Sequence, residues 1–145
     1  SCFGELCPCG NNDLLAGCAN STSTGAELFA LGSTSLTEDD LVLGVRGLPA
    51  GAPALVFFSN TTTQAFFWDG VLCVGGGTLS RTGRIDRPRL ASSGGEARWG
   101  PGLLSSPGMA ATSERLYLQA IYRDPFSACG SGVNVSNALE FDLIP

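Results

Sequence analysis

The feature that most constrains the fold of this chain is the alternation of side chains in its C-terminal part. Residues 116–123 read LYLQAIYR, so one face of an extended chain carries only Leu, Ala and Tyr, while the other face is mixed. Asp124 and Pro125 end this run, because proline has no backbone N–H to donate to a neighbouring strand. A second run follows, in which Leu139, Phe141 and Leu143 alternate with acidic residues. The pattern predicts two strands joined by a loop, each with one buried face.

Similar short apolar runs recur along the chain and are separated by clusters of Gly, Pro, Ser and Thr. The chain has 20 glycines and 8 prolines, and no apolar stripe with a helical period is present. Turn signals about every 8–12 residues are typical of β-sandwiches and barrels. Further strands are predicted at 27–31, 41–46, 54–58, 71–74 and 97–99, with 54–58 buried on both faces. Residues 59–63 are predicted to form a polar loop, and 91–108 mainly a surface connection. The sequence therefore predicts an all-β fold, an antiparallel β-sandwich (Ig-like or jelly-roll-like) of about seven to nine strands.

The charged residues and cysteines bound the class of protein. The net charge is −5, every one of the eight cations is arginine, and there is no histidine or lysine. Clustered Lys and Arg are what phosphate backbones require, so no nucleic-acid partner is expected. Six cysteines with no C-x-x-C pair and no histidine do not suggest a zinc site, whereas an even number suggests disulfides and a secreted, extracellular or cell-surface protein. No signal peptide or apolar run of ~18 residues is present, so we expect a mature product with no membrane span.

Two segments differ in composition. Residues 1–25 contain four of the six cysteines and end in the polar run NSTST, and they are predicted to form a Cys-rich N-terminal arm. Residues 26–145 are predicted to form the β-sandwich domain. A segment as short as the arm cannot build its own core, so it needs covalent staples or a partner surface.

Several short motifs carry a resemblance to a family. They are Cys2-Phe3-Gly4, Cys7-Pro8-Cys9-Gly10-Asn11, Gly17-Cys18-Ala19-Asn20-Ser21, Asp69-Gly70-Val71-Leu72-Cys73-Val74-Gly75-Gly76, Tyr122-Arg123-Asp124 and Asn134-Val135-Ser136-Asn137. Over nearly its whole length the chain resembles the secreted Cys-rich modules repeated in planctomycete-type bacterial surface proteins. It departs from their pattern at Trp68, where the family has a small residue, and at its end, Leu143-Ile144-Pro145. The resemblance implies a bacterial surface or matrix module and names no chemistry.

The cysteines can be paired in several ways. Cys73 ends a predicted inner strand and Cys129 lies in the loop of the final hairpin, so a Cys73–Cys129 disulfide is the favoured prediction. Cys2, Cys7, Cys9 and Cys18 would then pair among themselves in one of three ways. A bond between Cys7 and Cys9 is the least favoured, because a single intervening residue leaves little room for disulfide geometry.

Residues for catalysis or metal binding are scarce, and no catalytic residue, metal or cofactor is predicted. The serines have no His or Lys to activate them. Glu140 and Asp142 share a strand face and could serve as an acid/base pair, although a solvated outer face explains them better. The run Glu38-Asp39-Asp40 lacks the spacing of a calcium loop and reads as a solvated turn.

Two sets of residues could contact a ligand or another subunit. Arg81, Arg84, Arg87 and Arg89 fall within nine residues, and guanidinium groups bind carboxylates and sulfates. Pairing with the acids of the chain is the favoured explanation. Trp68 and Trp99, with Tyr117, could form an aromatic platform for a sugar, although aromatic residues are more often part of a core.

Glycosylation is a further candidate modification. Asn20, Asn60 and Asn134 each begin an Asn-x-Ser/Thr triplet, and Thr61, Thr62 and Thr63 could carry O-linked sugars.

The sequence favours a structural role over an enzymatic one. Sheet edges are normally guarded by charged residues, above all lysine, and this chain has no lysine and few charges. We therefore expect an extracellular structural subunit of a filament, sheath or matrix that assembles with copies of itself through strands or surfaces. The N-terminal arm could dock onto a neighbour by strand addition, or its cysteines could form a local clasp. The alternative is a surface module that binds carbohydrates or polyanions.

Overall fold

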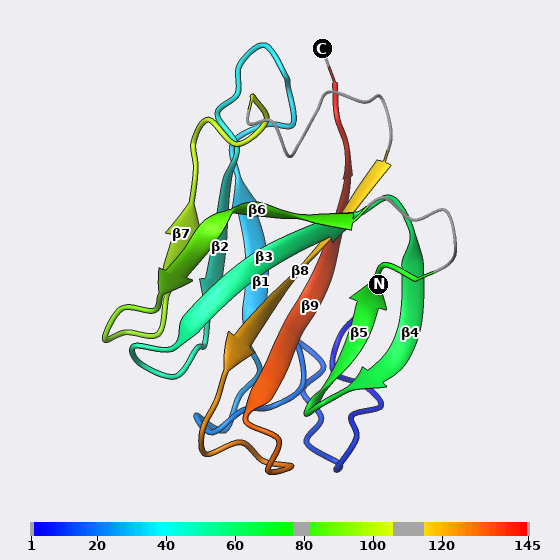
Figure 1. The fold of residues 1–145 in the computed structure, drawn as a ribbon, viewed down its shortest axis with the longest axis vertical. Helices are drawn as coiled ribbons and strands as arrows, with labels where there is room; N and C mark the ends of the chain where they lie inside the picture. Colours follow the sequence, from blue (N-terminus) through cyan, green and yellow to red (C-terminus); the bar gives the residue numbers. More distant parts are fainter. Residues whose placement is uncertain (1, 77–81, 106–114, 145) are drawn as a thin grey trace.

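The computed structural model describes residues 2–76, 82–105 and 115–144, and these contain nine strands and no helix. Figure 1 shows the strands in chain order. They are β1 (Glu27–Leu31), β2 (Val42–Arg46), β3 (Pro53–Ser59), β4 (Thr62–Phe67), β5 (Gly70–Val74), β6 (Thr82–Leu90), β7 (Ala97–Trp99), β8 (Arg115–Arg123) and β9 (Val133–Asp142).

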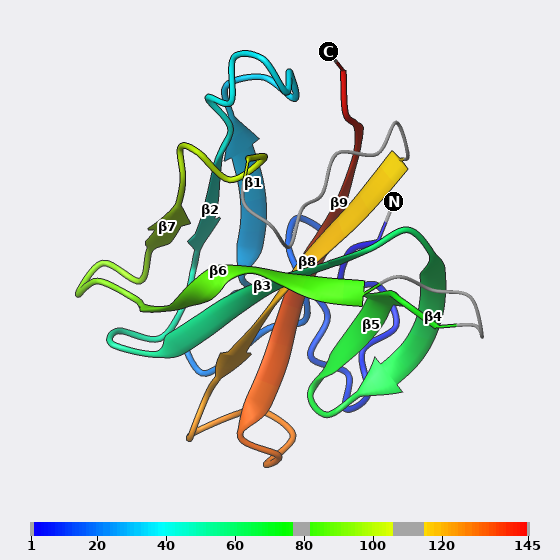
Figure 2. The same ribbon diagram turned by 45° about the horizontal axis from the view of Figure 1, so that its top comes forward.

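The strands form three antiparallel sheets. A three-stranded sheet has the order β1-β2-β7, a four-stranded sheet has the order β6-β3-β8-β9, and β4 and β5 form a separate hairpin. The first two sheets face each other in a sandwich-like arrangement, which is visible when Figures 1 and 2 are compared. The predicted all-β, antiparallel fold is confirmed, and the strand number lies at the upper end of the predicted range.

The main core lies between the two larger sheets. The four-stranded sheet contributes the predicted buried face of β8, namely Leu116, Leu118, Ala120 and Tyr122. The three-stranded sheet contributes Leu28, Leu43, Val45 and Trp99. Burying a side chain of this size contributes about 1.5–3 kcal/mol, so this layer accounts for most of the apolar stabilisation.

Two local predictions are wrong. Residues 54–58 are not buried on both faces, because Leu55 and Phe57 point away from the main core and are only half-buried. Residues 59–63 are not all loop, because β4 already begins at Thr62. The threonines fit a strand as well as a loop, since β-branched side chains pack well on a pleated surface.

The β4–β5 hairpin adds a third layer against the outer face of β8 and β9. This layer explains why Gln119, on the mixed face of β8, is fully buried. Its side-chain oxygen accepts a hydrogen bond from Cys73 N–H (3.0 Å), and its amide nitrogen donates to the carbonyls of Val71 (2.8 Å) and Ser136 (2.7 Å). The bonds with Cys73 and Val71 hold the hairpin on the sheet, and the bond to Ser136 connects β8 with its neighbour β9.

The disulfides differ from the favoured prediction. Cys73 pairs with Cys2, Cys129 pairs with Cys9 and Cys7 pairs with Cys18, so the predicted Cys73–Cys129 bond is wrong. The Cα–Cα distances are 6.3, 5.7 and 5.8 Å in the same order. No cysteine is free.

The route of the N-terminal segment explains this pairing. Cys73 lies in a second apolar cluster beneath the hairpin, together with Cys7, Cys18 and Val71, and Cys2 packs against that cluster. Cys129 instead lies in the β8–β9 loop. Because the N-terminal segment passes both places, each domain cysteine meets an N-terminal partner. Two of the three disulfides therefore join the N-terminal segment covalently to the rest of the chain.

Candidate functional site

A groove of about 530 Å³ opens between the N-terminal segment, the β4–β5 hairpin and the outer face of β8 and β9. The Cys2–Cys73 disulfide lies along it. Ala138 N–H donates a hydrogen bond to the Cys2 carbonyl (3.1 Å), which fixes the start of the chain against β9. The groove is thus held between segments that are far apart in sequence and joined covalently.

The groove has an apolar part and a polar part. Phe3, Leu6, Val71 and Leu139 line it together with the disulfide. The polar residues are Glu5, Thr62, Thr63, Gln64, Tyr117 and Glu140. No salt bridge or side-chain hydrogen bond among the described residues involves any of these six side chains. Their polar atoms are therefore available to a ligand.

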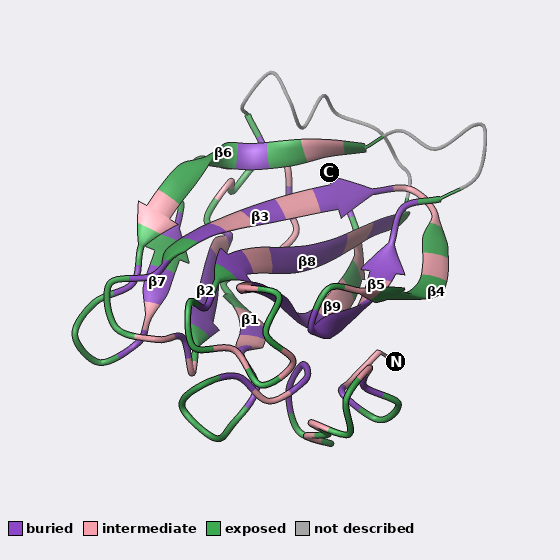
Figure 3. Cartoon of the chain, turned by 60° about the horizontal axis from the view of Figure 1, so that its bottom comes forward, coloured by how far each residue is buried: buried purple, intermediate pink, exposed green. Residues whose placement is uncertain are grey.

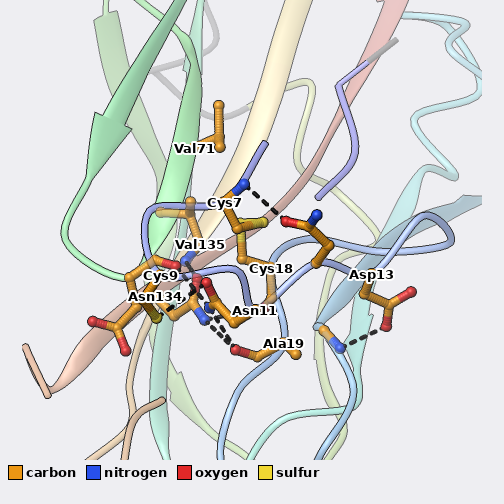
Figure 4. Close-up of a disulfide and its surroundings, with 12 residues drawn as sticks. Cys7, Cys9, Asn11, Asp13, Cys18, Ala19, Val71, Asn134 and Val135 are labelled. Carbon is orange, nitrogen blue, oxygen red and sulfur yellow. Dashed lines mark hydrogen bonds between the residues drawn. A yellow bond between two sulfur atoms is a disulfide. The ribbon is translucent and has the colours of Figure 1, made fainter. Parts of the chain in front are cut away.

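Asn11 and Asn134 hold the backbone of the folded chain, in contrast to the polar side chains of the groove. Figure 4 shows Asn11 and Asn134 pointing toward the backbone of the N-terminal segment. Asn11 donates to the carbonyls of Ala19 (2.9 Å) and Asp69 (3.0 Å), and Asn134 donates to that of Cys18 (3.1 Å). These amides satisfy carbonyls that lie outside any sheet.

Asp69, in the turn between β4 and β5, also forms structural hydrogen bonds. Its carboxylate is fully buried and accepts hydrogen bonds from Cys129 N–H (2.9 Å), from Ser131 N–H (3.2 Å) and from the Ser131 hydroxyl. Burial works to raise the pKa of Asp69, but the hydrogen bonds from Ser131 and Cys129 outweigh it, so the pKa is lowered. An ionised Asp69 therefore orders the loop that carries Cys129.

A second buried carboxylate connects the N-terminal segment to β8. Asp124 accepts a hydrogen bond from Ser21 N–H (2.8 Å), and its other oxygen has no partner among the described residues. Two residues earlier, the Tyr122 hydroxyl accepts a hydrogen bond from the Asn20 amide (2.9 Å). Burial raises the pKa of Tyr122. Tyr122 and Asp124 thus act as anchors for residues 20 and 21.

The predicted arginine cluster is not assembled into one site. Arg81 lies outside the described residues. Arg84 and Arg87 are exposed, and Arg89 pairs with Asp86 at 3.1 Å. Asp86 has a positive φ of 54° within an irregular part of β6, which interrupts the regular strand between Arg84 and Arg89.

The predicted aromatic platform is also divided. Trp99 is fully buried in the main core, where its ring N–H donates to the Arg87 carbonyl (2.8 Å), so its assignment to a ligand surface is wrong. Trp68 is 56% exposed at the β4–β5 turn and stacks on Phe67, with 6.0 Å between ring centroids. Of the three aromatic residues, only Tyr117 lines the groove.

The candidate glycosylation sites differ in accessibility. Asn20 and Asn134 are buried and hydrogen-bonded, which argues against a glycan on either in the folded protein. Asn60 lies half-buried in the turn before β4. Of the threonines, Thr62 is exposed, Thr61 and Thr63 are half-buried, and the Thr61 hydroxyl donates to the Gly76 carbonyl (2.9 Å).

Three of the five acidic residues considered for metal or acid/base chemistry, namely Asp39, Asp40 and Asp142, have structural partners. Asp39 accepts from Leu104 N–H (2.8 Å), and Asp40 accepts from the Ser33 hydroxyl (2.8 Å). Asp142 binds Arg115 through both carboxylate oxygens (3.0 and 3.2 Å), and this pairing lowers the pKa of Asp142. Within the described ranges there is no group of three or more residues that could hold a metal ion.

β4 forms the least protected sheet edge in the described part of the chain. It pairs only with β5, and its sequence TTQAFF has no charge and no proline. Figure 3 shows that it is exposed along most of its length, and Phe66 is 70% exposed. An edge of this kind can accept another strand.

The other edges have identifiable protection. On β5, the Gln119 side chain bonds the Cys73 N–H and the Val71 carbonyl. β6 contains Pro88, four charged residues and an irregularity at Asp86, and β7 has only three residues. On β1, the side chain of Asn137 bonds both backbone groups of Leu28. On β9, Ala138 N–H bonds the Cys2 carbonyl. Bulges, charges, prolines and covering groups are the usual means of blocking edge pairing.

Sequence reasoning missed the groove. Its lining comes from the N-terminal segment (Phe3, Glu5 and Leu6), from β4 (Gln64) and from β5, β8 and β9, and nothing in the local patterns indicates that these segments meet. Gln119 could have been found, because an amide in an otherwise apolar strand suggests a buried polar contact.

Comparison with models of protein families, with curated proteins and with solved structures finds no match to this chain. None of the described residues belongs to a helix long and apolar enough to cross a membrane.

Proposed function

We propose that this chain is a non-catalytic structural unit of an extracellular assembly and that it associates with copies of itself through β4. The observation that carries the proposal is the uncharged, exposed edge of β4 in a molecule whose other described edges are protected. The bacterial surface module that the sequence motifs resemble is compatible with this role.

Antiparallel pairing of β4 with β4 of a second copy would extend the hairpin into a four-stranded sheet. Such a contact is self-complementary, and an uncharged strand meets its own copy without like-charge repulsion. The register of β4 shifts between Thr62 and Ala65, so the regular part of the edge is short. The exposed rings of Phe66 and Trp68 would supply apolar contact area in addition to the backbone hydrogen bonds.

The disulfides support a mechanical and extracellular role. Bonds that span 71 and 120 residues restrict the unfolded chain strongly, by about 4–5 kcal/mol each in the chain-entropy view. Structural disulfides persist in oxidising compartments, which favours a secreted protein.

A filament, sheath or matrix needs more than this one contact. A self-complementary interface closes a dimer, and extension requires a second surface. The exposed apolar residues Leu14, Leu15 and Phe126, which lie in loops, are candidates for it.

The test is sedimentation velocity over a range of concentrations. Phe66→Lys places a charge on the β4 edge and should weaken self-association about tenfold or more. The matched control is Leu90→Lys, because Leu90 is 72% exposed at the protected edge strand β6. A wild-type chain that stays monomeric at millimolar concentration, or equal effects of the two variants, would refute the proposal.

A further inference from the structure

We infer that the groove beside the Cys2–Cys73 disulfide binds a neutral saccharide. Phe66 and Trp68, the apolar residues of the proposed contact between copies, do not line the groove. Thr62, Thr63 and Gln64 of β4 do line it, so the two sites are adjacent and the ligand is tested with the contact between copies blocked. Its size of about 530 Å³ lies within the range of about 300–1,000 Å³ that is usual for small-molecule sites.

The lining has the two kinds of surface that a sugar ring needs. Phe3, Val71 and Leu139 offer apolar area to the C–H faces of a ring, and Tyr117 adds a half-buried aromatic ring. Glu5, Gln64 and Glu140 offer carboxylate and amide groups that can accept hydrogen bonds from hydroxyls. Carboxylate acceptors form the stronger type of hydrogen bond.

The polar groups of the groove lack partners, unlike the asparagine amides of the N-terminal segment and of β9. Asn11, Asn20, Asn134 and Asn137 all hold backbone or side-chain partners. By contrast, the amide of Gln64 and the hydroxyl of Tyr117 have no hydrogen bond to any described residue. A ligand can therefore bind them without breaking a contact of the folded chain, so binding requires little reorganisation.

The charge of the groove selects against anionic ligands. Glu5 and Glu140 are present, and the described lining residues include no arginine. Arg115 interacts electrostatically with Glu140, but its guanidinium group is already hydrogen-bonded to both carboxylate oxygens of Asp142. Like charges disfavour uronic acids and sulfated sugars, so a neutral glycan fits and a polyanion does not.

The experiment is isothermal titration calorimetry with soluble neutral hexasaccharides of glucose, mannose, galactose, xylose and N-acetylglucosamine, and with hyaluronan hexasaccharide as the anionic probe. The protein is the full chain carrying Phe66→Lys, so that binding is measured without self-association. We expect at least one neutral hexasaccharide to bind and hyaluronan not to bind. Binding of no neutral member, or preferential binding of hyaluronan, would overturn the inference while leaving the proposed structural role untouched.

Variants locate the ligand. Glu140→Gln should weaken binding of the neutral ligand about tenfold, and Tyr117→Ala should do the same. Tyr117→Phe retains the ring and should retain most of the affinity, which separates loss of ring contact from misfolding. Glu38→Gln removes an exposed carboxylate outside the groove and is the control. Affinities that are unchanged in Glu140→Gln and Tyr117→Ala would place the ligand elsewhere and contradict the inference.

Discussion

The side chain of Asn137 bonds both backbone groups of Leu28. Its oxygen accepts a hydrogen bond from Leu28 N–H (2.8 Å), and its amide nitrogen donates to the Leu28 carbonyl (3.2 Å). Asn137 lies on β9 and Leu28 on β1, so one amide connects the two sheets of the sandwich and closes an edge of one of them. Both residues are buried, so no water can replace the amide without rearrangement.

Replacing Asn137 by Ala should lower the free energy of unfolding by about 3 kcal/mol, because two buried backbone groups lose their partners. Urea denaturation measures the change. Gln64→Ala is the matched control, since that amide is exposed and should contribute little to stability. A loss of stability equal to that of the control would show that the contact between Asn137 and Leu28 does not hold the sheets together.

The disulfide pattern makes a second prediction. Proteolysis of the non-reduced protein followed by mass spectrometry should yield linked peptides for Cys2–Cys73, Cys7–Cys18 and Cys9–Cys129. Reduction should separate all three pairs. A disulfide that joins Cys73 directly to Cys129 would contradict the structure and would free the N-terminal segment from the domain.

The third prediction concerns acid. Because the folded-state pKa of Asp69 is lowered, its ionised form stabilises the fold above the ordinary value of 3.8, and this contribution is lost as the pH falls through the folded pKa. Asp69→Asn should therefore be less stable than wild type at pH 7, and the difference should shrink below pH 3.8. Ser131→Ala removes a donor to Asp69 and should lose part of the same contribution. Chemical denaturation at several pH values measures both, and a difference that is constant with pH would rule out this role of Asp69.

Much of the fold could be predicted from the sequence, because period-two alternation reports directly on which face of a strand is buried. Residues 116–123 and the turn at Pro125 are examples, and β8 ends at Arg123 as predicted. The alternation could not show that Gln119 would be covered by a third layer, since that depends on where a distant hairpin packs. Disulfide pairing was mispredicted for the same reason: Cys73 and Cys129 were placed correctly within their local elements, but the path of the N-terminal segment past them has no local signal. The groove is formed by the N-terminal segment, the β4–β5 hairpin, β8 and β9, whereas a local sequence pattern describes only one segment at a time.

Hydrogen exchange of the β4 backbone amides, measured by NMR at low and high protein concentration, decides whether two copies of the chain pair through β4. If two copies pair through this strand, amides in residues 62–67 that are open in the monomer should gain a partner, and their exchange should slow as the concentration rises. Amides of the protected edge strand β6 should not change, and Phe66→Lys should abolish the effect. Exchange in β4 that stays independent of concentration, or slowing confined to other strands, would contradict the account.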